Sequence, residues 1–166
     1  MTSTDPLQAW LLGHGFPPDG YDAVVADRTT PLMRASYPSR PDIVRALIDA
    51  GVALNSRNAD GNNALWLACV SNDSDTIDAL IAAGIDLENR NDNEATSLMY
   101  AASSGKANLL EKLLTAGALL HHQTLDGFTA LDIASTLDCL RLLRGADQNR
   151  RRTEAAEASC VAPALC

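Results

Sequence analysis

Three glycines, Gly51, Gly84 and Gly117, follow one another at intervals of 33 residues, and this spacing constrains the fold more than any other feature of the chain. The same interval relates four leucines and four alanines, which are Leu32, Leu65, Leu98 and Leu131, and Ala35, Ala68, Ala101 and Ala134. A fixed period between about 20 and 50 residues indicates one supersecondary unit stacked on copies of itself. Such stacks usually present a surface to a partner rather than enclose a catalytic pocket.

The period divides most of the 166-residue chain into four successive units. Their ranges are 27–59, 60–92, 93–125 and a truncated 126–147. The last unit is shorter because Gly145 comes five residues earlier than the period requires. Residues 1–26 are expected to form an N-terminal capping helix and loop that shield the first apolar face. Residues 148–166 lack a long apolar period, and we expect a C-terminal tail there that is mobile or forms at most a short helix.

Each unit is predicted to contain a turn, a short inner helix, an outer helix and a closing glycine. Thr30 before Pro31 is typical of a helix start, since threonine caps a free N–H group and proline suits the first helical position. Apolar residues then recur at helical spacing, and a glycine follows where a left-handed residue can end the helix. The predicted inner helices are 31–37, 64–71, 97–103 and 130–135, and the predicted outer helices are 41–50, 74–83, 107–116 and 137–143.

The units resemble the ankyrin repeat in three motifs, which are T-P-L-x-x-A at 30–35, the D-G turn at 60–61 and G-A-D at 145–147. The resemblance covers about 120 of the 166 residues. It implies an all-α solenoid of paired antiparallel helices, with short β-hairpin fingers that project at right angles from a gently concave slab. The chain departs from the family where a histidine is common, because Met33 and Trp66 stand there in the first two units. It is similar to the small stand-alone ankyrin proteins that are common in bacteria.

The family's geometry implies that finger tips and the ends of the inner helices form the binding side. The partner-binding residues expected on this basis are Asp60, Asn62, Trp66, Val70, Asp92, Asn93, Tyr100, Ser103, Ser104, Leu125, Asp126 and Phe128. Leu125 and Phe128 are large apolar residues on a turn, and they either anchor a partner or pack on the neighbouring finger or the tail. Trp66 lies one period from Met33 and from Met99, so its role is either inter-repeat packing or partner contact.

The net charge of −8 is concentrated in the second unit. Its charged residues are Asp60, Asp73, Asp75, Asp78, Asp86, Glu88 and Asp92 against Arg90 alone. An acidic surface repels nucleic acid and favours a basic protein partner, with a merely solvated face as the alternative. Asp73, Asp75 and Asp78 suit the start of an outer helix, where the helix dipole favours anions. Asp60 and Asp92 lie on fingers and are the better candidates for contact.

No residues show the spacing of a catalytic, cofactor or metal site. His121 and His122 are adjacent on a finger, where neighbouring side chains point to opposite faces, so they do not easily chelate one ion together. The chain has no glycine-rich phosphate loop, no HExxH motif and no nucleophile elbow. We therefore expect a chain that is not an enzyme and that holds neither a cofactor nor a metal.

The apolar runs are too short to span a membrane, and the first residues lack the basic and apolar regions of a secretory signal. The cysteines show no metal-ligand spacing and suggest a reduced, cytoplasmic chain, although Cys160 and Cys166 could pair under oxidation. We expect a cytoplasmic monomer.

The function that these patterns favour is a non-catalytic protein–protein interaction module, which binds its partner through its fingers and concave face. The alternative is a dedicated inhibitor or immunity protein that covers a basic enzyme with the carboxylates of the second unit. A more distant alternative is an enzyme or a metal-binding protein, which would need converging titratable groups that repeat stacks rarely supply.

Overall fold

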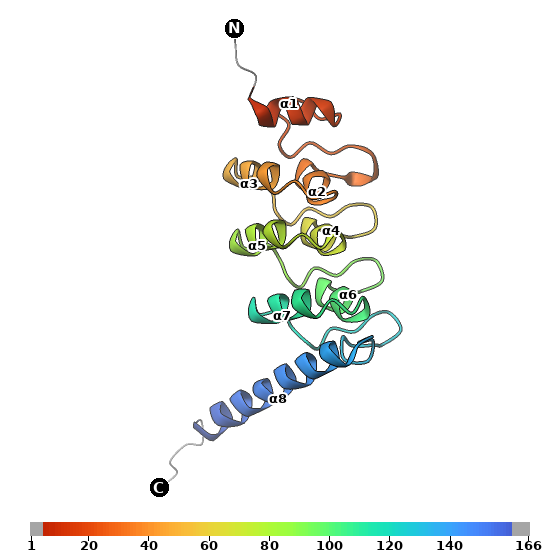
Figure 1. Ribbon diagram of the computed structural model, residues 1–166, viewed down its shortest axis with the longest axis vertical. Helices are drawn as coiled ribbons and strands as arrows, with labels where there is room; N and C mark the ends of the chain where they lie inside the picture. Colours follow the sequence, from red (N-terminus) through yellow and green to blue (C-terminus); the bar gives the residue numbers. More distant parts are fainter. Residues whose placement is uncertain (1–4, 161–166) are drawn as a thin grey trace.

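The computed structural model describes residues 5–160 and shows an elongated stack of helices (Figure 1). Helix pairs follow one another along the long axis in chain order, with α1 at one end and α8 at the other. The helices are α1 Pro6–Gly13, α2 Pro31–Ser36, α3 Pro41–Asp49, α4 Ala64–Ser71, α5 Ser74–Ala82, α6 Ser97–Ser103, α7 Ala107–Thr115 and α8 Leu137–Cys160. The helix expected near the N-terminus and the first three predicted helix pairs are therefore confirmed.

Repeated local signals begin and end these helices. Thr30, Asn63 and Thr96 each accept a hydrogen bond from the backbone N–H three residues later, at the start of an inner helix. Each cap satisfies one N–H group that the first turn leaves without an intrahelical acceptor. The outer helices end just before glycines with a left-handed backbone, where an L side chain would be strained. These glycines are Gly51, Gly84 and Gly117, with φ of +78°, +84° and +99°.

The apolar core runs unbroken through the stack, because each unit buries the same positions. Leu32, Leu65 and Leu98 of the inner helices are at most 1% exposed. The equivalent outer-helix leucines are fully buried; they are Leu47, Leu80 and Leu113. Helix α2 packs on α4, α4 on α6, and α3 on α5. Burial of each leucine is worth about 1.5–3 kcal/mol, so the repeated leucine positions dominate the stability of the stack.

The fourth unit departs from the predicted pattern, because residues 130–133 form a turn and no inner helix follows. Asp132 directs its carboxylate back to the N–H and the hydroxyl of Thr129, at 2.8 and 2.6 Å. The N–H of Ser135 donates to the carbonyl of Ala102 in the preceding unit, at 3.1 Å. The N–H of Ser135, which would donate within an inner helix, is thus bonded to the neighbouring unit instead. The inner helix predicted over 130–135 is wrong.

Helix α8 corrects the expectation about the C-terminal part. Gly145, which was expected to end the last outer helix, lies inside α8. Arg150 forms ion pairs with carboxylates one turn before and one turn after it, at 2.9 and 2.5 Å. An interior glycine costs a helix only about 1 kcal/mol, and ion pairs three or four residues apart offset part of that cost. Residues 148–160 of the expected tail are therefore helical, and residues 161–166 lie outside the described part of the chain.

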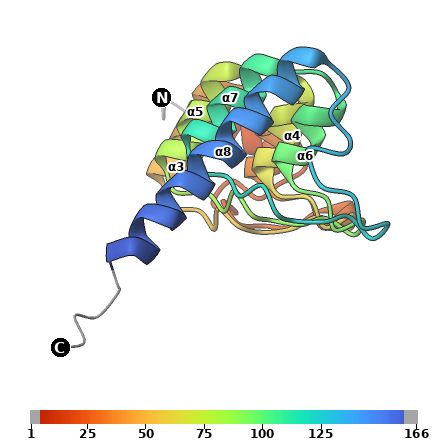
Figure 2. The same ribbon diagram turned by 90° about the horizontal axis from the view of Figure 1, so that it is seen from below.

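Loops between successive units project to one side of the stack and form the fingers (Figure 2). Each finger is closed by one backbone hydrogen bond between its two arms. These bonds run from the N–H groups of Val25, Asn58, Asn91 and Thr124 to the carbonyls of Thr29, Asn62, Ala95 and Phe128. The fingers, numbered one to four in that order, keep the form of a hairpin, although no β-strand is present within residues 5–160.

Candidate protein-binding surface

The tips of the four fingers are joined into one row by backbone hydrogen bonds. In each case an N–H of one finger donates to a carbonyl of the finger before it. The bonds link Ala59 to Asp27, Asp92 to Asp60 and Leu125 to Asn93, at 2.7, 3.0 and 3.2 Å. The predicted finger residues are therefore held along one continuous edge.

Arg57 adds side-chain contacts between fingers two and three. Its guanidinium donates to one carbonyl in each finger, at 3.0 and 2.7 Å, and lies 3.9 Å from the carboxylate of Asp92. Asp92 therefore has a positively charged neighbour already. Asp60 and Asp126 form no ion pair within the described residues. Of the acidic finger residues predicted to contact a partner, Asp60 and Asp126 are therefore the two whose negative charge no neighbouring cation offsets.

Asn62 offers a partner little surface, because the side chain and backbone are only 9% exposed. Its N–H donates to the side chain of Asn58 at 2.9 Å, and its carbonyl accepts the bond that closes finger two. The residue holds the turn together. Its predicted role as a contact residue is corrected to a structural one.

Trp66 on α4 and Tyr100 on α6 bring their half-buried rings together, with centroids 5.3 Å apart and planes tilted by 49°. The ammonium group of Lys106 lies 4.9 Å from the centre of the Tyr100 ring and 3.2 Å from its hydroxyl. It also donates to the carbonyls of Cys69 and Val70, at 2.8 and 3.3 Å. The C-terminal end of a helix favours a cation, so Lys106 stabilises that end of α4. The same ammonium group holds Tyr100 of the aromatic pair in place.

The methionines one period on either side of Trp66 are core residues. Met33 is 1% exposed and Met99 is 2% exposed. At these two positions the series of Met33, Trp66 and Met99 therefore packs between repeats. Trp66, which is half-buried, is the member of the series with surface left for a partner.

The ends of the inner helices expose the predicted residues Val70, Ser103 and Ser104. Tyr37 lies one period before Val70 and is also exposed. Within residues 25–118 these two are the only exposed large apolar side chains. Together with the Trp66–Tyr100 pair they give the middle of the stack a short apolar strip.

Finger four exposes two large apolar residues. Leu125 is 70% exposed and Phe128 is 51% exposed, with the exposed Asp126 between them. Packing on the neighbouring finger or on α8 therefore covers only part of either side chain. Most of their surface is open to a partner.

Acidic residues of the second unit contribute to the fold on the outer layer. Asp73 caps α5 and accepts hydrogen bonds from an N–H of the first turn, at 3.0 Å, and from the hydroxyl of Ser39. Burial alone would raise the pKa of Asp73, but these hydrogen bonds lower it below its usual value. Asp78 pairs with Lys112 of α7 at 2.5 Å. The concentration of charge in this unit therefore reflects helix capping and helix pairing as well as any contact surface.

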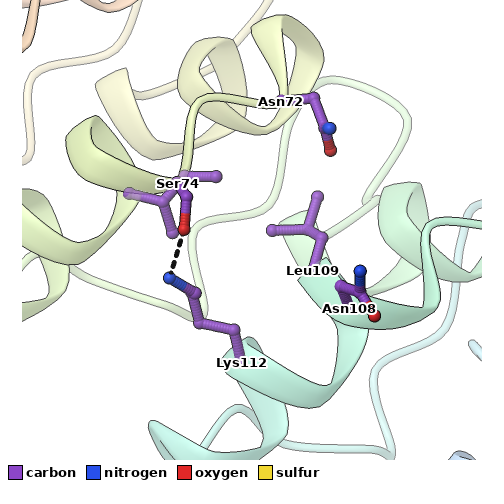
Figure 3. A pocket seen from close by; sticks show the side chains of 6 residues that line it. Asn72, Ser74, Asn108, Leu109 and Lys112 are labelled. Atoms are coloured by element: carbon purple, nitrogen blue, oxygen red, sulfur yellow. Dashed lines mark hydrogen bonds between the residues drawn. The ribbon is translucent and has the colours of Figure 1, made fainter.

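The outer layer also holds a small cavity of about 180 Å³ between α5 and α7 (Figure 3). It is lined by Asn72, Ser74, Ile77, Asn108, Leu109 and Lys112. Lys112 reaches across it and donates to the hydroxyl of Ser74, at 2.7 Å. The lining combines amides, one hydroxyl and one ammonium group, and the same ammonium group pairs with the carboxylate of Asp78.

Residues 5–160 bring together no group of three histidine, cysteine or acidic side chains of the kind that holds a metal. His121 is exposed, whereas Nε2 of His122 lies 2.7 Å from the carboxylate of Glu88. The buried thiol of Cys69 has its pKa raised to about 12 by desolvation, so it stays protonated and unreactive. None of the helices in this part of the chain has the length and apolar character that crossing a membrane requires.

Lys106 is the residue of this surface that the sequence reasoning missed. It stands just before α7, where the helix dipole disfavours a cation, and its side chain makes no capping bond to that helix. The equivalent position of the preceding unit is Asp73, which does cap its helix. That mismatch between residue type and position is a signal in the sequence that the side chain is used elsewhere.

The comparison with protein families agrees with this geometry. The model for ankyrin repeats (3 copies) matches residues 5–91 and again residues 71–152. No curated protein matches the chain significantly. Ankyrin repeats are generally protein–protein interaction modules, and they are typically non-catalytic. Because the two matches together span most of the sequence, the chain belongs to the ankyrin-repeat family.

Proposed function

We propose that the chain is a non-catalytic module that binds a protein partner across the finger row and the apolar strip of Tyr37, Trp66, Val70 and Tyr100. The observation that carries the proposal is the Trp66–Tyr100 pair, half-exposed in the middle of the stack and fixed in place by Lys106. Aromatic residues held rigidly at the centre of a surface are the usual anchors of an interface. A polar rim of serines and finger residues would surround them, as in ordinary interfaces.

The charges suggest a partner with basic groups at the edge of its interface. Asp60 and Asp126 stand at the tips of fingers two and four without an ion pair in the described residues. Their field would attract lysine or arginine side chains and raise the association rate. We place the module in the cytoplasm, because Cys69 and Cys139 are buried and free.

A dedicated inhibitor or immunity protein for a basic enzyme remains the second candidate. It is favoured by the same two finger carboxylates, but the other acidic residues lend it less support. Asp73 and Asp78 are engaged on the outer layer, and Asp92 has Arg57 beside it. A partner that is an enzyme, and whose activity the chain blocks at a one-to-one ratio, would identify this narrower function.

Capture experiments with matched variants test the proposed surface. Immobilised wild-type chain should retain a partner from a lysate of its natural source, and so should Asp49→Asn, which changes only an exposed residue at the end of α3. Tyr100→Ala and Val70→Asp should lose that partner, provided that both variants still unfold cooperatively. Retention of the same partner by both of these variants would place the interface elsewhere.

Fluorescence gives a second, direct readout once the partner is purified. The chain has two tryptophans, and Trp10 is buried against Phe16 and His14 near the N-terminus. In a Trp10→Phe background, emission comes from Trp66 alone and should shift when the partner covers the apolar strip. An unchanged Trp66 spectrum at saturating partner would count against contact at the Trp66–Tyr100 pair.

A further inference from the structure

A hollow of about 210 Å³ lies at the C-terminal end of the stack, between the base of finger four and α8. Its walls combine apolar and charged side chains. The apolar ones are Leu120, Leu131 and Leu143, and the charged ones are Asp147, Arg150 and Arg151 of α8. A protein cavity of about 150 Å³ is large enough for a molecule of benzene, so the hollow has room for an aromatic ring or a short branched chain.

Part of the apolar wall is open because the fourth unit has no inner helix and no further repeat covers it within residues 5–160. Leu131 is 38% exposed, whereas Leu98, its equivalent in the third unit, is 1% exposed. Repeat stacks normally shield such an end with a polar terminal unit. An apolar group in the hollow would cover surface of Leu131 that water now contacts, and that burial favours binding.

The charged wall contains a polar atom without a partner. Nε of Arg150 is buried and has no hydrogen-bond acceptor in the described residues. The two terminal nitrogens of the same guanidinium pair with Glu154 and Asp147, at 2.5 and 2.9 Å. Buried donors in proteins are nearly always hydrogen-bonded, so this atom indicates a place for an acceptor that the protein itself does not supply.

The charge of this part of α8 favours an anionic acceptor. From Asp147 to Glu154 the helix carries three arginines and two carboxylates, in a chain with a net charge of −8. Asp147 is shared between Arg150 and Arg151, and Arg152 forms no ion pair in the described residues. Guanidinium groups bind carboxylates through charge-assisted hydrogen bonds. A single surplus positive charge matches a carboxylate, whereas a phosphate monoester carries nearly two negative charges.

We infer that the hollow is a binding site for a small carboxylic acid with an aromatic or branched aliphatic body. The body would lie against Leu120 and Leu131, and the carboxylate would accept the Nε–H of Arg150. His121 also lines the hollow, and its imidazole has an N–H donor in either tautomer. Neither the finger tips nor the apolar strip contributes to the lining, so the inference does not depend on the proposed function.

Titration of the ¹⁵N-labelled chain with phenylacetate, followed by NMR, tests the inference. Phenylacetate has about ten non-hydrogen atoms, for which a dissociation constant of about 1–10 mM is expected. The largest shifts should fall on the backbone amides of residues 129–131 and 143–151. The Nε–Hε signal of Arg150 should move to lower field as it gains a charged acceptor. Phenylacetamide has the same shape without the charge and should bind at least fivefold more weakly.

Two pairs of matched variants locate the site, at about 150 mM salt to screen distant charges. Arg150→Gln removes the unpartnered donor and should weaken phenylacetate binding at least fivefold. Arg152→Gln removes the same charge outside the lining and should change the dissociation constant less than twofold. Leu131→Asp places a carboxylate in the apolar wall and should abolish binding. Leu137→Asp makes the same change at an exposed leucine outside the lining and should leave binding nearly unchanged.

Three results would overturn the inference. The first is a titration to about 20 mM phenylacetate that shifts no signal around the hollow. The second is phenylacetamide binding as tightly as phenylacetate. The third is an equal effect within either pair of variants, with both members folded by circular dichroism; the leucine pair decides alone if Arg150→Gln does not fold. Because no protein partner is present in these experiments, their failure would leave the proposed partner-binding function untouched.

Discussion

The hydroxyl of Ser39, in the turn between α2 and α3, donates a hydrogen bond to the carboxylate of Asp73, which caps α5 in the next unit. One carboxylate thus serves two purposes, because it satisfies the first turn of its own helix and ties that helix to the preceding repeat. The positions are 34 residues apart, close to one period. The contact couples the stability of α5 to that of its neighbour.

Asp73→Ala should destabilise the chain by about 0.5–2 kcal/mol at pH 7, the usual cost of losing a helix cap. The hydrogen bonds lower the pKa of Asp73, so its contribution is present above the ordinary aspartate pKa of about 3.9 and is lost as the pH falls through the lower folded value. Urea unfolding of both proteins at pH 7 and pH 3 measures this. Ser39→Ala should show part of the same loss of stability. If the difference in stability between wild type and Asp73→Ala were as large at pH 3 as at pH 7, the prediction would be wrong.

Leu98→Ala should cost about 2–5 kcal/mol, because Leu98 is 1% exposed and its removal leaves a cavity between stacked units. Leu119→Ala is the matched control, since that leucine is 52% exposed and its loss should cost less than about 0.5 kcal/mol. Urea unfolding at neutral pH compares the two. A loss below about 1 kcal/mol for Leu98→Ala would show that its position is not a packed core position.

The helices were predictable where the sequence keeps its period. Thr30, Leu32 and Gly51 mark a cap, a core contact and a stop, and each signal acts within a few residues of its own position. Local signals of this kind predict the helices correctly, because each repeat packs on neighbours of the same structure and these contacts do not override them. The helices from α1 to α7 accordingly lie where the patterns indicate.

The fourth unit was not predictable in the same way, because its structure depends on contacts with other units. Ser135 donates its N–H to Ala102 of the third unit, and no local pattern reveals that competition. Gly145 resembles the stop glycines in sequence but lies inside a helix held by ion pairs around Arg150. For the candidate site, the sequence identified the exposed finger residues but missed Lys106, whose contacts lie on the preceding repeat.

Glu94→Gly should stabilise the chain by about 0.5–1 kcal/mol, because Glu94 adopts a left-handed backbone with φ +57° that favours glycine. Gly61 and Gly127 occupy the same place in fingers two and four, with φ +76° and +82°. The change also removes an exposed ion pair with Arg90, so Glu94→Gln is needed to measure that loss separately. In thermal unfolding, the Tm of Glu94→Gly should be higher than that of wild type, and the Tm of Glu94→Gln should be equal to it or lower. The reverse order would contradict the prediction.

Lys106→Met should destabilise the chain by roughly 1–2 kcal/mol, because the carbonyls at the end of α4 lose a charged hydrogen-bond donor. It should also change the emission of Trp66 in a Trp10→Phe background, since Lys106 holds Tyr100 beside that ring. Lys112→Met is the control, because that lysine bridges α5 and α7 on the outer layer. Equal spectral effects from both variants would mean that Lys106 does not position the aromatic pair.

The last prediction connects the finger charges to partner binding and rests on the proposed function. The double change Asp60→Asn and Asp126→Asn should slow association about three- to tenfold at low salt, because these carboxylates have no ion pair in the described residues and steer a basic partner. Asp92→Asn should have a smaller effect, since Arg57 already balances Asp92, and Asp49→Asn on α3 should have almost none. Phe128→Ala should instead speed dissociation about tenfold, the effect of losing roughly 1.4 kcal/mol of apolar contact.

Surface plasmon resonance with the captured partner at two salt concentrations separates these outcomes. If Asp49→Asn slowed association as much as the double change, the finger charges would act only on solubility, and the interface would have to be sought on the outer helices.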